Sequence, residues 1–140
     1  MYSMIFFGLF KRKNRILDSS HKVFSAKEYP DHVITLEGKN FNSFIEKYPL
    51  SIVDFWAPWC VPCKTMGPRL RRLSKIYVGK VAFGKLDTQK NQEIAKKYKI
   101  MGIPHLVFFS YGKKIAELTG VKSVGYIKDT ISDLLDKSKR

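Results

Sequence analysis

The stretch SIVDFWAPWCVPCK, residues 51–64, decides the fold that we expect for this chain. Its first six residues, Ser51 to Trp56, are mostly apolar and rich in β-branched and aromatic side chains, a pattern typical of a short buried strand. Beyond Cys63, apolar residues recur at helical spacing, so a helix leads away from the two cysteines. Cys60 and Cys63 are therefore expected at the N-terminus of a helix that closely follows a strand.

The helix after the cysteines has a recognisable apolar face. Its spacing places five residues on that face: Met66, Leu70, Leu73, Ile76 and Tyr77. Pro68 lies inside this helix and is expected to kink it, because proline lacks the N–H of a helical hydrogen bond.

Strand and helix patterns alternate along the chain on both sides of this stretch. Strands are predicted at 33–36, 51–56, 81–86, 106–109 and 115–118, and a turn at Tyr111 and Gly112 joins the last two. Helices are predicted at 41–48, after the cysteines, at 92–98, and after Ser123, where the apolar face is Val124, Ile127, Ile131, Leu134 and Leu135. The order β-α-β-α-β-α-β-β-α predicts a single α/β domain, with a central mixed sheet flanked by helices on both faces.

The composition fits one domain with one dominant site. A chain of 140 residues, 44% of them hydrophobic, can bury one good core. Its 26 Lys and Arg against 12 Asp and Glu give a net charge of +14, which favours acidic partners, anionic surfaces or nucleic acid. Two cysteines form one bridge at most, which excludes a multi-disulfide scaffold. No apolar run approaches the roughly 20 residues of a membrane-spanning helix.

Residues 1–32 are interpreted as an N-terminal extension, flexible or peripheral, before a domain at 33–140. An apolar run, Tyr2 to Phe10, precedes a basic cluster of Lys11, Arg12, Lys13 and Arg15. A secretory signal has the opposite order, so we expect a cytoplasmic protein. The apolar and basic features suit a weak peripheral anchor on anionic lipid. A disordered arm or a segment packed on the domain are the alternatives.

The spacing of the two cysteines predicts redox chemistry. At the start of a helix both sulfurs lie within one turn and can form a bridge, yet so short a loop adds little stability. The positive end of the helix stabilises a thiolate on the first cysteine, so Cys60 is the expected nucleophile and Cys63 the resolving thiol. Pro62 suits the first turn, where its missing N–H loses no helical bond. No cofactor is expected beyond this disulfide.

Several motifs together resemble those of the thioredoxin family. They are the run from Val53 to Lys64, Pro68 in the helix, Lys85 in the next strand, Gly102-Ile103-Pro104 before the hairpin, and Gly120 after it. The resemblance covers about Val33 to Leu135. It implies the thioredoxin fold and a protein disulfide oxidoreductase that reduces target proteins by dithiol–disulfide exchange. It also implies an upstream thioredoxin reductase or equivalent dithiol donor, and we expect a monomer.

The resemblance also assigns roles to residues by position. Asp54 resembles the family's buried carboxylate, whose pKa desolvation would raise, which suits it to accept the proton of Cys63. Lys85 resembles the lysine beside that acid. Pro104 resembles the cis-proline that faces the cysteines and presents the preceding backbone to an extended substrate segment. The apolar contact surface around the exposed sulfur is expected from Trp59, Ile103 and Gly120, with Trp56 packed beside it. For Asp54 the alternative is a helix cap, and for Lys85 a solvated strand residue.

Two positions depart from the family's usual pattern. Val61 replaces the commonest glycine between the cysteines, and His105 replaces the commonest threonine after the proline. Together with Pro62 they are expected to set the active-site geometry and the redox potential. An imidazolium at His105 close to Cys60 would favour the thiolate and raise the potential. Alternatively, His105 points away from the sulfurs, because side chains alternate faces along a strand.

Three other functions stay open on the sequence alone. A membrane-associated or exported thioredoxin-like reductase or isomerase is the first. A zinc site could combine the cysteines with His21, His32 or His105, but none has finger-like spacing, and we expect no metal. A nucleic-acid-binding module would use the basic residues Lys64, Arg69, Arg71, Arg72 and Lys75, with Lys96, Lys97 and Lys99 farther on. No recognition motif accompanies them, so we expect no specific nucleic acid.

Overall fold

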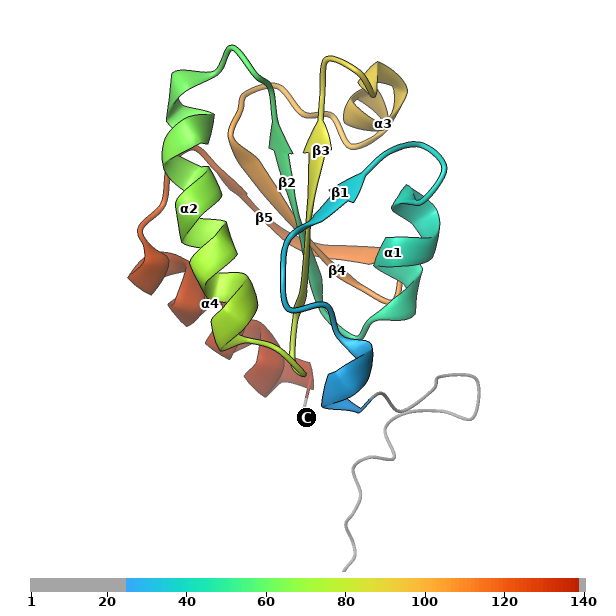
Figure 1. Ribbon diagram of the computed structural model, residues 1–140, viewed down its shortest axis with the longest axis vertical. Coiled ribbons are helices and arrows are strands. Elements are labelled where there is room, and N and C mark those ends of the chain that lie inside the picture. The colour runs from blue at the N-terminus through green and yellow to red at the C-terminus, as the bar shows by residue number, and fades with distance from the viewer. Residues whose placement is uncertain (1–24, 139–140) are drawn as a thin grey trace, which may run out of the picture. The chain divides into compact units, whose positions relative to one another are not determined.

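The computed structural model describes residues 25–138, and these form two compact units, 25–124 and the segment from Gly125 onward. Within residues 25–124 a five-stranded sheet forms the centre (Figure 1). Its strands are β1 (Ile34–Leu36), β2 (Ser51–Trp56), β3 (Ala82–Asp87), β4 (His105–Ser110) and β5 (Lys113–Thr119). They lie in the order β1-β3-β2-β4-β5. The pairs β1–β3 and β3–β2 are parallel, and β2–β4 and β4–β5 are antiparallel, so the sheet is mixed as predicted.

Helices lie on both sides of this sheet. Helix α2 (Val61–Ile76) lies on one side, and α1 (Phe41–Lys47) and α3 (Gln92–Lys97) lie on the other (Figure 1). Parallel strands need such crossover helices, and α1 and α2 supply them between β1, β2 and β3. Because β2 and β3 are parallel, their carboxyl ends meet at one edge, where α2 begins.

The segment from Gly125 contains nearly all of α4 (Val124–Ser138). Ile127 and Ile131 are fully buried, which confirms the centre of the predicted apolar face. Leu134 and Leu135 are half-buried. Within residues 25–138, no helix combines the length and apolarity required to cross a membrane.

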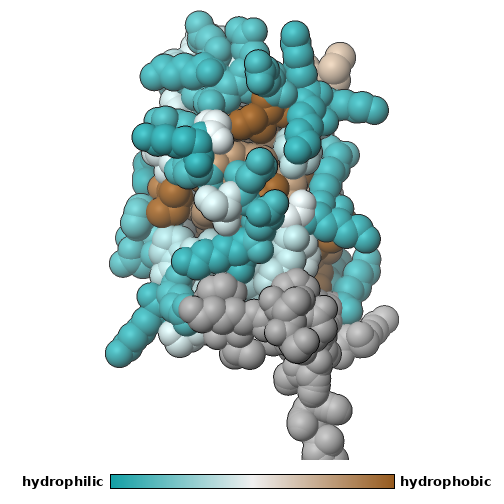
Figure 2. All heavy atoms as spheres, turned by 90° about the vertical axis from the view of Figure 1, so that its right-hand side faces the viewer, coloured by the Kyte–Doolittle hydropathy of each residue, from teal (hydrophilic) through white to brown (hydrophobic). Residues whose placement is uncertain are grey.

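An aromatic cluster fills the space between the sheet and helices α1 and α3. Phe41 of α1 packs edge-on against Phe109 of β4, with ring centroids 6.0 Å apart. The centroid of the Phe41 ring also lies 6.4 Å from that of Phe55 of β2. Tyr98, at the end of α3, lies 5.3 Å from Phe109. These rings hold both helices on the same face of β2 and β4. The outer surface over α1 and α3 is mostly hydrophilic, with only small separate apolar areas (Figure 2).

The order of elements is the predicted one. Two local predictions, the turn at Tyr111 and Gly112 and the buried face of α2, have different outcomes. The turn at Tyr111 and Gly112 is confirmed, with φ of 47° and 87° at these residues. The prediction that Ile76 lies on the buried face of α2 is wrong, because its side chain is 48% exposed. Ser74 is buried in the last turn of α2 instead.

Regular structure begins before the predicted domain boundary at residue 33. A 3₁₀ turn, η2 (Ala26–Glu28), leads to Tyr29, which is buried with its ring 5.1 Å from that of Tyr48. Residues 1–24, which include the apolar run and the basic cluster, lie outside the described residues. The function of the extension therefore stays a prediction.

Candidate active site

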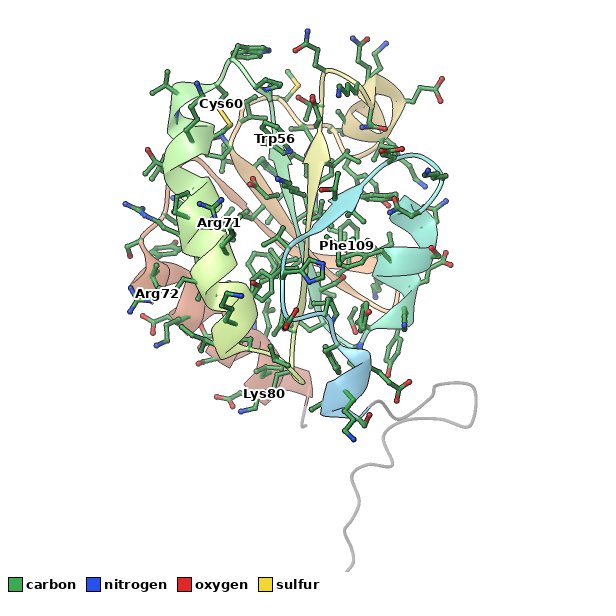
Figure 3. The ribbon with its side chains drawn as sticks, viewed as in Figure 1. Trp56, Cys60, Arg71, Arg72, Lys80 and Phe109 are labelled. Atoms are coloured by element: carbon green, nitrogen blue, oxygen red, sulfur yellow. A yellow bond between two sulfur atoms is a disulfide. The ribbon has the colours of Figure 1, made fainter. Side chains whose placement is uncertain are left out.

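The two cysteines form a disulfide at the N-terminus of α2 (Figure 3). Strand β2 ends at Trp56, a turn follows, and Cys60 is the N-cap of the helix. The backbone N–H of Cys63 donates to Cys60 Sγ at 3.2 Å, so the sulfur takes the position of a capping acceptor. Pro62 lies in the first turn, as predicted. The N–H groups and dipole of this helix end stabilise negative charge on the first sulfur once the disulfide is reduced.

The loop before β4 faces the disulfide. The Ile103–Pro104 peptide bond is cis, and the carbonyl oxygen of Ile103 lies 3.8 Å from Cys60 Sγ. The backbone N–H of Gly120 donates to the carbonyl of Pro104 at 2.8 Å, which ties this loop to the end of β5. Gly120 has φ of +88°, a conformation that glycine adopts without strain. The structure thus brings together Cys60, Ile103, Pro104 and Gly120, which the sequence analysis placed at one site.

The disulfide lies in apolar surroundings and is itself buried, with two exposed apolar side chains nearby. Both cysteines are buried in a cluster with Ala57, against which Trp56 and Ile103 pack. Trp59 and Val61 are 68% and 70% exposed, so they form an apolar rim around the buried sulfurs. Trp59 therefore lies where a target protein can touch it, and Trp56 packs beside the cysteines as expected.

Asp54 is a buried acid on β2, on the sheet face toward α2. It is 4% exposed, and its Oδ1 has no hydrogen-bond partner among the described residues. Burial raises the pKa of this carboxyl to about 7, and the charge of Lys85 opposes the shift. Lys85 lies directly opposite on β3, with its Nζ 5.4 Å from the ring centroid of Trp56. Near neutral pH the carboxyl can therefore both take up and release a proton.

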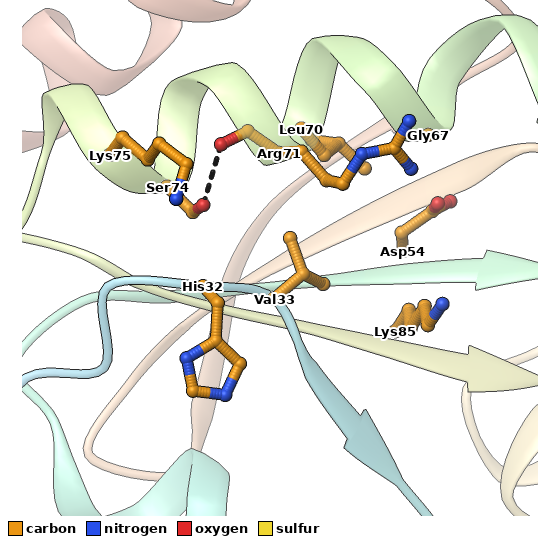
Figure 4. A pocket seen from close by; sticks show the side chains of 9 residues that line it. All are labelled: His32, Val33, Asp54, Gly67, Leu70, Arg71, Ser74, Lys75 and Lys85. Atoms are coloured by element: carbon orange, nitrogen blue, oxygen red, sulfur yellow. Dashed lines mark hydrogen bonds between the residues drawn. The ribbon is translucent and has the colours of Figure 1, made fainter.

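Asp54 lines two adjoining cavities. One, of about 260 Å³, is lined by Asp54 and Cys63 and by Trp56, Lys64, Gly67, Pro68, Arg71 and Lys85. The other, of about 160 Å³, extends along α2 toward Ser74 and Lys75 (Figure 4). Asp54 and Cys63 thus share one cavity, which brings the predicted base close to the thiol that it would serve.

The structure places His105 differently from the hypothesis of direct contact with Cys60. Its side chain, 6% exposed, lies on the face of β4 shared with Phe55, opposite to that of Asp54. One ring nitrogen hydrogen-bonds Glu117 at 2.8 Å and the other Thr119 at 2.9 Å. Both partners come from β5. These contacts match the alternative in which His105 points away from the sulfurs.

Among residues 25–138, no cluster of three or more His, Cys, Asp or Glu side chains is arranged to hold a metal ion. Both cysteines are joined in the disulfide, and His105 is bound to β5. His32 pairs with Asp31 on the surface. His21 lies outside the described residues.

Two features of this region could not be predicted from the sequence. The first is the pair of β5 partners of His105, Glu117 and Thr119, which alternation along a strand places on one face. The second is the lining of the cavities by Arg71 and Lys75, which the helical spacing of α2 brings to one side. Lys85 was expected beside Asp54, and the register of β2 with β3 places it there.

Comparisons with known proteins agree with this geometry. The family model for thioredoxin matches residues 32–133, which spans both compact units. A thioredoxin of Staphylococcus aureus is 35% identical over 105 residues, covering 75% of this chain and 96% of that protein. The solved structure of a mutant thioredoxin from Halobacterium salinarum NRC-1 is similar with a TM-score of 0.71 and 28% identity, covering 76% of this chain and 93% of its own.

A second solved structure is similar over much the same length. It comes from work on the thiol resolving mechanism in yeast mitochondrial 1-Cys peroxiredoxin via glutathione/thioredoxin systems, with a TM-score of 0.66 and 27% identity. It covers 79% of this chain and 99% of that chain. The chain belongs to the thioredoxin family and is a thiol–disulfide oxidoreductase whose redox group is the Cys60–Cys63 disulfide.

Proposed function

We propose that the reduced protein donates two electrons to disulfides of target proteins, with Cys60 attacking and Cys63 resolving. The observation that carries this proposal is the position of Cys60 Sγ, at the N-cap of α2 and beside the Ile103 carbonyl. The helix end favours a thiolate there, and an extended target segment can pair with the backbone before Pro104. Trp59 and Gly120 complete the contact surface.

The exchange proceeds in two balanced steps. The Cys60 thiolate attacks one sulfur of the target disulfide, which forms a mixed disulfide and releases the other target sulfur as a thiolate. Cys63 then gives its proton to Asp54 and attacks Cys60 Sγ, which re-forms the Cys60–Cys63 disulfide and releases the second target thiolate. The charge of Lys85 favours the ionised form of Asp54, which keeps this base available near neutral pH.

An upstream dithiol donor, a thioredoxin reductase or its equivalent, restores the reduced state. The proposal includes that the protein acts as a monomer and that it acts in the cytoplasm, where disulfides are typically transient and catalytic. It also includes weak contact of the N-terminal extension, residues 1–32, with membrane surfaces. Val61 and Pro62, between the cysteines, are proposed to tune the potential.

Insulin reduction with dithiothreitol as donor tests this activity. The protein is expected to accelerate insulin precipitation at catalytic concentrations, whereas dithiothreitol alone acts slowly. A rate equal to the dithiothreitol control would overturn the proposal. The reduction potential of the Cys60–Cys63 couple then distinguishes a reductase from an isomerase or oxidase, because those classes have less negative potentials.

A further inference from the structure

Helix α2, which carries the redox disulfide, is strongly basic. Between Val61 and Ile76 it has no acidic residue, and its five basic residues are Lys64, Arg69, Arg71, Arg72 and Lys75. The positive end of the helix dipole lies at the disulfide and adds to this field. Negative charge is therefore attracted to the flank of the molecule next to the reactive sulfurs.

Part of this charge surrounds the two adjoining cavities, which we call the basic groove. Asp54, Gly67, Arg71 and Lys85 line both cavities. One end of the basic groove reaches Cys63 and Lys64, and the other reaches Ser74 and Lys75. In Figure 4 the Arg71 side chain extends along α2 toward Asp54, and Lys85 lies across from it. The groove thus runs from the resolving cysteine along one flank of α2.

The acidic groups near the basic groove leave most of its charge uncompensated. Asp54 is buried, with a pKa raised to about 7, so it is partly protonated at neutral pH. Asp31, whose pKa is lowered mainly by His32 and slightly by Lys75, is bonded to His32. Among residues 25–138, no carboxylate lies within 4.0 Å of the charged nitrogens of Arg71, Lys75 or Lys85.

We propose that the basic groove binds an acidic segment of the target protein, so that target disulfides flanked by Asp or Glu are reduced preferentially. This proposal rests on the proposed function, because the groove guides the target toward the sulfurs of α2. Carboxylate side chains of the segment would pair with Arg71, Lys75 and Lys85. Arg71 offers the planar fork of donors that suits a carboxylate.

A nucleic acid fits the same charge less well. Bases bind by stacking on open aromatic faces. Trp56, the aromatic ring at the cysteine end of the groove, packs against the cysteine cluster and has Lys85 over its ring. A nucleic acid also contains no disulfide that the Cys60–Cys63 pair at the end of the groove could reduce. An acidic protein segment accounts for both the charge and its location.

Charge complementarity of this kind acts mainly on the rate of association and is weakened by salt. We therefore expect kcat/KM to differ between two disulfide-bridged peptides that are identical except for four Glu or four Lys residues beside the bridge. The Glu peptide should be reduced about tenfold faster at low ionic strength. The preference should fall to about twofold in 1 M NaCl, where the Debye length is about 3 Å.

A matched pair of variants distinguishes the effect of the groove on this preference from the effect of the overall charge. Arg71→Gln/Lys75→Gln removes two positive charges that line the groove, and Arg72→Gln/Lys80→Gln removes two that do not. Lys80 lies beyond the end of α2 that is remote from Cys60 (Figure 3). The groove variant should lose most of the preference for the Glu peptide, and the control variant should keep it. Equal loss in both variants would overturn the proposal, as would equal rates for both peptides with the parent protein.

A binding measurement on the oxidised protein distinguishes failure of this proposal from failure of the proposed function. A Glu-rich peptide without cysteine should bind the parent and the control variant, and bind the groove variant at least severalfold more weakly. Absence of binding would overturn the proposal even if insulin is reduced. A 20-nucleotide single-stranded DNA that displaces this peptide and binds more tightly would assign the groove to nucleic acid instead.

Discussion

Asp54 of β2 and Lys85 of β3 are directly paired across two parallel strands, yet the lysine does not restore the ordinary acidity of the carboxyl. Burial has the larger effect and raises the pKa of Asp54 to about 7. The pair therefore holds a proton-exchanging group beside the cavity that reaches Cys63.

Asp54→Asn should make the oxidised protein more stable than the parent at pH 8. The unfolded chain has the ordinary pKa of 3.8, so the unfolded state loses this proton first as the pH rises. The stability linked to Asp54 is complete below about pH 4 and is lost as the pH rises through about 7. At about 1.4 kcal/mol per pKa unit, the loss amounts to about 4 kcal/mol. Urea unfolding of parent and variant at pH 4 and pH 8 measures this loss of stability. Equal free energies of unfolding for the two proteins at pH 8 would disprove the prediction.

The same variant should slow the second step of exchange more than the first. In the proposed mechanism, formation of the mixed disulfide depends on the Cys60 thiolate, whereas its resolution depends on deprotonation of Cys63, for which Asp54 is the proposed base. General bases contribute about 10²–10⁴-fold to such steps, so at pH 7 we expect resolution to slow by at least tenfold. Stopped-flow fluorescence separates the two phases. Glu93→Gln, on the exposed surface of α3, is the control and should change neither phase.

His105 is predicted to act through β5 and not through Cys60. His105→Thr removes a buried ring and two hydrogen bonds, so it should lower the free energy of unfolding by about 2 kcal/mol. Any change in reduction potential should be the same at pH 6 and pH 8, because the ring hydrogen-bonds Glu117 and Thr119 of β5 on the sheet face opposite to Asp54. Redox titration at the two pH values checks this. A shift confined to pH 6 would restore direct coupling of His105 to Cys60.

Deletion of residues 1–20 should leave insulin reduction unchanged. These residues precede both the family match at 32–133 and the described residues, which begin at Ser25. The same deletion should reduce binding to anionic vesicles at low salt, because it removes the apolar run and the basic cluster. Co-sedimentation with vesicles containing phosphatidylserine measures this. If the full-length protein does not sediment with them, the membrane contact is excluded.

The sequence predicted the elements whose signals are local. Strand β2 matches its predicted range of 51–56, and the two-residue turn at Tyr111 and Gly112 is where predicted. Ile76 was assigned to the wrong face because it is the last residue of α2, where helical spacing no longer determines what lies beneath it. The resemblance to thioredoxins supplied what local signals do not, including the cis peptide bond before Pro104.

Two features could not be predicted because they depend on contacts between distant residues. The hydrogen bonds of His105 require the β4–β5 register, which contains an irregularity at Phe108 and Phe109. The basic groove is lined by residues of α2, β2 and β3 and by residues 32–33, and these segments are far apart in the chain. The basic residues that follow the cysteines were visible in the sequence, but the cavities that Arg71, Lys75 and Lys85 line were not.

A trapping experiment with Cys63→Ser, followed by mass spectrometry, tests the proposed roles of the two cysteines most directly. This variant keeps the attacking sulfur and lacks the resolving one, so a target protein should remain attached through a mixed disulfide to Cys60. Cys60→Ser should form no such adduct and should have no insulin reductase activity. Loss of activity in both variants without an adduct on Cys60 would contradict the assigned roles of the two cysteines.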